Sequence, residues 1–303
     1  MRLIRIILTA VFLLALPWAT YAAEAEKAAA VPAKEEGIPR EPVGVGHIGP
    51  LPITNSMVVT WVVALGLILF ARYATRNIQE VPSGAQNFFE FMVESLYDFL
   101  ADILGHDLTK KTFFFFATVF ILILFTNWFG LLPGFGTIGW GHPGPQHFEV
   151  TRPWLRGGNA NLNMTLAMSL VFFVLWVVWA LQSNGPVGVI KHIFGPKGGF
   201  TGIMLALLIP IFLAVGAIEV VSIAFRPVSL SFRLYGNIFA GENIIDSMSN
   251  LVPGLGWLLP IPFYFMELLV GFVQAFVFML LTAVYTLLIC AHDEDEHEKA
   301  HHH

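Results

Sequence analysis

Ionisable side chains lie inside a long apolar region, in the stretch EVVSIAFRPVSLSFRLYGNIFAGE at residues 219–242. A charge at the centre of a bilayer is costly, so such residues are rare and usually functional. Arg226 directly precedes Pro227, a position typical of a helix irregularity or an interface. Arg233 has neither an adjacent acid nor a nearby membrane end. Arg233 is therefore the strongest candidate in this stretch for a functional group.

The polar residues around Arg233 share one face if the stretch is a helix that turns about 100° per residue. This polar stripe consists of Glu219, Ser222, Ser229, Arg233 and Asn237. Glu242 falls roughly 180° from Arg233 and so faces the other way. The pattern predicts a track of polar side chains that leads to Arg233 along one face of the helix. Beyond Arg233, the acid Glu242 lies on a different face. The alternative is a polar seam between packed helices, with Arg233 neutralised by an acid elsewhere in the chain.

The string SLSFRLYGNIFAGE resembles the signature of subunit a of F-type ATP synthases, the stator subunit that passes ions to a rotating ring of c subunits. The arginine of this string, which the family requires for ion translocation, matches Arg233. The resemblance implies a protein that couples ion flow to rotation and ATP synthesis through two offset half-channels. It also implies that ATP chemistry resides in partner subunits, so the chain itself is not an enzyme.

Two further strings resemble the same family. QAFVFMLLTAVY is similar to the family's last helix, which carries a glutamine at the place of Gln274, and some relatives have histidine where this chain has Glu267. TNWFGLLPG is similar to a motif in which Asn127 matches a polar channel residue and Gly130 stands where some members have aspartate. The resemblance assigns Asn127, Asn237, Glu242, Glu267 and Gln274 to an external half-channel. It assigns Glu219, Ser222 and Ser229 to a cytoplasmic one.

The composition indicates a polytopic membrane protein without a large soluble domain. The 303 residues are 56% hydrophobic and 12% charged, whereas soluble chains are about 25% charged. The single cysteine, Cys290, excludes a disulfide framework and a cysteine metal site. The chain has no basic patch suited to nucleic acid and no GxxxxGK[ST] string for nucleotide. We expect no cofactor and no metal.

The apolar runs predict an all-α membrane protein with about five transmembrane helices. The first three spans are predicted at 55–72, 112–132 and 162–181, and two long regions follow at 203–248 and 254–291. The residues at 83–105 form an amphipathic pattern that predicts a helix along the membrane surface. A break at Pro227, and a similar one in the last region, would give seven spans. The resemblance favours two long, steeply tilted helices that form a membrane hairpin.

The ends of the chain define its expected orientation. Residues 1–23 are typical of a secretory signal peptide, with an uncleaved signal anchor as the alternative. Residues 24–52 predict a flexible external segment, 53–291 the ion-translocating domain and 292–303 a cytoplasmic tail. Lys and Arg are concentrated in the short loops on one side of the predicted spans. The positive-inside rule then places a mature N-terminus outside and the C-terminus inside a bacterial inner membrane.

Two other classes of membrane protein could carry intramembrane charges. A secondary transporter would normally show internal repeats, and we find none in this sequence. A purely structural scaffold would not explain five polar residues on one stripe. The partners implied by the resemblance are the ring of c subunits, the peripheral-stalk subunit b, the remaining subunits of the membrane and catalytic sectors, and the lipid bilayer. The sequence leaves open whether the ion is H⁺ or Na⁺.

Overall fold

The computed structural model describes residues 44–48, 51–132, 134, 138–143, 148–195, 203–252 and 254–290. The predicted signal peptide, most of the predicted external segment and the C-terminal tail lie outside these residues. The described helices are α2 (Asn55–Ala74), α3 (Ala85–Leu104), α4 (His106–Gly130), the short 3₁₀ helix η2 (Gly158–Ala160), α5 (Leu162–Phe194), α6 (Ile203–Leu251) and α7 (Ile261–Cys290). The five predicted spans correspond to α2, α4, α5, α6 and α7, each long and apolar enough to cross a membrane.

Two small hairpins, which the sequence analysis did not predict, complete the described elements. Strands β1 (Gly44–Ile48) and β2 (Leu51–Thr54) pair antiparallel, as do β3 (Gly139–Pro143) and β4 (Phe148–Pro153). The side-chain amide of Asn55 donates to the carbonyl of Pro153 at 3.0 Å. This bond ties the start of α2 to the end of β4, so the loop before α5 is anchored next to the first span.

The helix α6 is continuous through Pro227, which decides between the two predicted span counts. Its 49 residues are roughly 74 Å long at 1.5 Å per residue, whereas the hydrocarbon core is about 30 Å thick. A helix of this length fits a bilayer only if it lies steeply tilted. The prediction of five spans with long, tilted final helices is confirmed, and the alternative of seven spans is wrong. The helix α5 is also longer than predicted, because it continues past a kink at Gly185 to Phe194.

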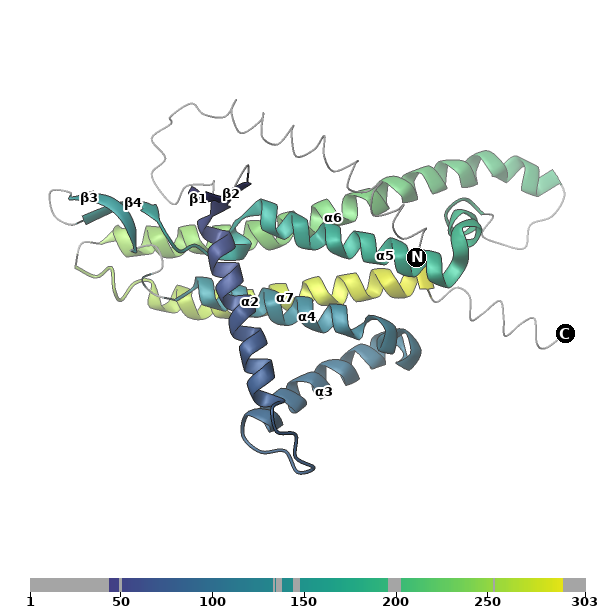
Figure 1. Ribbon diagram of the computed structural model, residues 1–303. Helices are drawn as coiled ribbons and strands as arrows, with labels where there is room; N and C mark the ends of the chain where they lie inside the picture. The colour runs from purple at the N-terminus through teal and green to yellow at the C-terminus, as the bar shows by residue number, and fades with distance from the viewer. Residues whose placement is uncertain are drawn as a thin grey trace.

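Helices α4, α5, α6 and α7 run lengthwise beside one another, while α2 runs across them (Figure 1). If the 20-residue α2 stands upright in the membrane, the other four must be inclined. A buried apolar core joins α4, α5, α6 and α7 and includes Phe116, Ile123, Phe172, Leu234 and Met279. Because α6 and α7 are consecutive and contact each other, they form the predicted hairpin.

The amphipathic helix predicted at 83–105 is α3. Its Leu96, Phe99 and Ile103 pack against the core, whereas Phe88 and Phe91 are exposed. Its acidic residues lie on the exposed side. An exposed apolar patch flanked by acids is typical of a helix at a membrane surface.

Candidate functional site

The polar stripe lies on the outer surface of α6 within a membrane span. The side chains of Ser222, Ser229, Arg233 and Asn237 are exposed, and that of Glu219 is half-buried. Among the described residues, no acid lies within ion-pair distance of Arg233. The alternative of an internal polar seam is therefore not supported by the packing. An arginine exposed at this depth would be too costly against lipid, so this face of α6 needs another protein surface or water.

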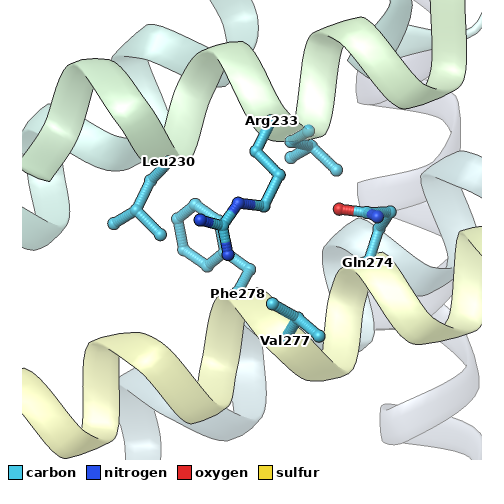
Figure 2. A pocket seen from close by; sticks show the side chains of 6 residues that line it. Leu230, Arg233, Gln274, Val277 and Phe278 are labelled. Atoms are coloured by element: carbon cyan, nitrogen blue, oxygen red, sulfur yellow. The ribbon is translucent and has the colours of Figure 1, made fainter.

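Arg233 reaches from α6 toward α7, and Gln274 points toward it from α7 (Figure 2). The two side chains line a small recess between the helices, whose other walls are apolar: Leu230, Leu234, Val277 and Phe278. The helix α7 therefore supplies an amide beside the guanidinium and no counter-charge. A positive charge with no acid paired to it among the described residues can attract a carboxylate from a partner.

Arg226 is held differently, although it lies on the same helix. Its guanidinium lies 5.5 Å from the ring centre of Trp176 and 4.5 Å from that of Tyr285, and it interacts electrostatically with Glu219. The indole of Trp176 also donates to the carbonyl of Tyr285 at 2.8 Å. Arg226 therefore joins α5, α6 and α7, as the interface interpretation of the sequence expected. Arg233 is therefore the exposed arginine of α6, whereas Arg226 is half-buried.

Glu242 and Glu267 meet where α6 and α7 approach the segment before η2. Oε2 of Glu242 lies 3.8 Å from Nε of Arg156, and the two side chains are 13% and 5% exposed respectively. The carboxyl group of Glu267, which is 2% exposed, lies so close to the backbone of Gly241 that a Cβ there would overlap it. Since Gly241 directly precedes Glu242, the two acids belong to one buried polar cluster.

Asn127 of α4 connects this cluster to the next turn of α7. Its amide nitrogen donates to the carbonyl of Gly271 at 3.0 Å, and its amide oxygen accepts from Asn159 at 2.6 Å. Gly271 lies one helical turn beyond Glu267, and Gln274 lies one turn further. Four of the five residues predicted for the external side therefore lie between the buried acids and the recess beside Arg233: Asn127, Glu242, Glu267 and Gln274. The fifth, Asn237, is exposed on the polar stripe.

Gly130 lies where an aspartate side chain would have no room. A Cβ on Gly130 would be 2.9 Å from Cα of Gly157, and a Cβ on Gly157 would be 2.7 Å from Oε1 of Glu242. The two glycines allow α4 and the segment before η2 to come into backbone contact. The charged group that this contact brings to the acids is Arg156, the residue before Gly157.

Sequence reasoning missed Arg156 and Asn159 as members of the cluster. Both lie in the Gly-rich segment before α5, which has no helical periodicity to assign them a face. The only signal was the presence of polar residues in a loop between two apolar spans. Within the described residues, no group of three or more His, Cys, Asp or Glu side chains could hold a metal ion.

Comparison with known proteins identifies the family. The model for "ATP synthase A chain" matches residues 57–287. "ATP synthase subunit a" of Gloeobacter violaceus is 34% identical over 256 residues, which cover 83% of this chain and 89% of that protein. The subunit a of Helicobacter hepaticus is 33% identical, with 75% and 85% covered, and that of Citrifermentans bemidjiense is 34% identical, with 80% and 89% covered. The chain therefore belongs to the ATP synthase A chain family, the non-catalytic, ion-translocating stator subunits of the ATP synthase membrane sector.

Proposed function

We propose that Arg233 is the fixed charge between two offset half-channels, which pass H⁺ or Na⁺ to and from carboxylates on a ring of c subunits. A continuous water path across the membrane would dissipate the ion gradient. Two half-channels avoid this leak if each reaches the middle of the membrane from one side and the ring carries the ion between them. A guanidinium suits the position because it stays protonated in proteins. Its charge favours the ionised form of the facing carboxylate and repels a cation that would cross directly.

One observation supports this proposal above the others: the polar stripe around Arg233 is exposed on a membrane-spanning helix. Lipid cannot solvate a guanidinium, two hydroxyls and an amide at that depth without a large cost. A partner surface that carries a carboxylate would remove the cost. The ring of c subunits supplies that chemistry, and membership of the family already implies assembly with other ATP synthase subunits.

We assign Asn127, Glu242, Glu267 and Gln274, together with Asn237, to the external half-channel. Carboxyl groups can take up and release protons, and amides can hold water between them. We assign Glu219, Ser222 and Ser229 to the cytoplasmic half-channel, because they lie on the exposed stripe on the other side of Arg233. Glu219 then interacts with both the path and Arg226.

The chain is a multi-pass membrane protein, and we propose a bacterial inner membrane as its location. In the proposed orientation, residues 1–23 are a signal peptide, the mature N-terminus is outside and the residues after α7 are cytoplasmic. The peripheral-stalk subunit b is a further proposed partner. The ion, H⁺ or Na⁺, would be identified by whether ATP hydrolysis of the whole complex depends on sodium.

Cysteine cross-linking tests whether the polar stripe faces the ring. With Cys290 changed to serine, Ser229→Cys and Asn237→Cys should each form a disulfide with a cysteine placed beside the ring carboxylate. Both positions are exposed and lie one turn from Arg233. Leu65→Cys, which is exposed on α2, is the control and should form none. Assembled complexes in which neither stripe position reacts, or in which Leu65→Cys reacts equally, would contradict the proposed interface.

Labelling of loop cysteines tests the proposed orientation. Ile78, between α2 and α3, is 75% exposed, and Leu255, between α6 and α7, is 44% exposed. In the Cys290→Ser background, an impermeant thiol reagent should label Leu255→Cys from outside intact cells. It should label Ile78→Cys only in inverted vesicles. Labelling of both positions from the same side would overturn the assignment of the two faces.

A further inference from the structure

Arg156 forms an ion pair with Glu242 in the buried acid cluster. Its Nε lies 3.8 Å from Oε2 of Glu242, and its guanidinium also lies 6.0 Å from the ring centre of Phe239 on α6. Only 5% of its side chain is exposed. Taking an arginine out of water costs several kcal/mol unless a partner compensates, on the order of the penalty known for buried ions. The carboxylate of Glu242 compensates part of this cost.

The backbone holds Arg156 in this place. Gly157 lies between Gly130 of α4 and the carboxylate of Glu242. A Cβ on Gly130 would clash with Cα of Gly157, and a Cβ on Gly157 would clash with the carboxylate of Glu242. The next residue, Gly158, is equally enclosed, because a Cβ there would overlap Thr60 of α2. A segment pinned on several sides cannot withdraw easily. The guanidinium is thus a fixed feature of the cluster.

We propose that Arg156 is a positioning residue that favours the ionised form of Glu242, from which this acid accepts ions, and that it thereby helps to set the pH range of the external half-channel. Burial of the carboxyl group and the neighbouring Glu267 oppose that form. This inference rests on the proposed place of Glu242 in that half-channel. A positive charge within about 4 Å stabilises a carboxylate relative to the neutral acid. With Arg156 present, Glu242 receives a proton from outside and gives it up readily to the next group.

The other groups around Glu242 leave this role to Arg156. Among the described residues, Glu267 of α7 faces Glu242 with the same sign of charge, and Asp246 lies one turn further along α6. The helix α4 contributes only neutral groups near the cluster, namely Gly130, Asn127 and Thr126. Two like charges in a buried site disfavour each other. Arg156 is therefore the positive charge that balances the cluster.

The test uses the whole ATP synthase in vesicles, with ATP synthesis driven by a fixed potential and the pH varied on the side that the external half-channel faces. Arg156→Gln should shift the pH midpoint of the rate per assembled complex upward by roughly 1 to 3 units, because a carboxyl without its cation holds its proton to higher pH. Arg156→Lys should restore most of the original midpoint. Arg76→Gln removes an arginine that is exposed near the end of α2 and should leave the profile unchanged.

Three outcomes separate this proposal from its rivals. If Arg156 only supports folding, Arg156→Gln will lower the amount of assembled complex and leave the pH profile per complex unchanged, which overturns the proposal. If Arg156 acts through Glu242, adding Arg156→Gln to Glu242→Gln will cause no further shift, as expected here. If Glu242→Gln alone leaves synthesis at the original rate, the proposed half-channel itself is wrong, and the role of Arg156 falls with it.

Discussion

Arg233→Ala is expected to abolish ion-driven ATP synthesis and to open a passive ion leak. Without the guanidinium, no fixed charge favours release of the ion from the ring carboxylate, so rotation loses its direction. The same loss removes the barrier between the two half-channels. Each charge that crosses 100 mV carries about 2.3 kcal/mol, so an open path would dissipate the driving force quickly. The measurement is ion uptake into vesicles under an imposed potential, together with ATP synthesis and an immunoblot of the assembled complex.

Two variants act as controls for this prediction. Arg233→Lys keeps a charge but lacks the planar, always-protonated fork, so it should fail in synthesis while leaking less than the alanine variant. Arg226→Ala removes the guanidinium stacked on Trp176 and Tyr285, so it should reduce assembly without a leak. A fully assembled Arg233→Ala complex that still synthesises ATP at a substantial rate would refute the mechanism.

The elements that carry Arg233 could be predicted from sequence because a membrane imposes simple rules on composition. Apolar runs gave the five spans, and the amphipathic pattern gave α3 to within two residues at each end. The continuity of α6 could not be derived, because a proline inside a helix permits either a break or a continuous helix. In the structure α6 is continuous through Pro227 and packs against α5 and α7.

The stripe on α6 could be predicted, but the buried cluster could not be completed. Helical periodicity placed Arg233 and Asn237 on one face and Glu242 on another, and the structure shows the first two exposed and Glu242 turned inward. The partners of Glu242 come from other parts of the chain. Arg156 and Asn159 reach the cluster only through the backbone contact between Gly130 and Gly157, and no local pattern encodes that contact.

Glu242→Gln and Glu267→Gln are each expected to lower ion-driven ATP synthesis at least about a hundredfold, which is the smaller end of the effect of losing a positioned group that transfers protons. The carboxyl group of Glu267 is enclosed against Gly241, and the residue is only 2% exposed. Bulk water therefore cannot easily replace this carboxyl group in proton transfer. Glu94→Gln, which removes an exposed acid of α3, is the control and should have no effect. Rates are compared per assembled complex.

The double variant decides whether the two acids act on one route. Because Glu267 contacts the residue next to Glu242, the two changes should interact, as contacting residues commonly do by about 0.5–3 kcal/mol. Once Glu242→Gln has interrupted the path, the loss of Glu267 can add little, so the double variant should be hardly slower than the slower single variant. Effects that multiply within error would mean that the acids serve separate functions. In that case the series from Glu267 through Gly271 to Gln274 would be a packing feature and not a path for ions.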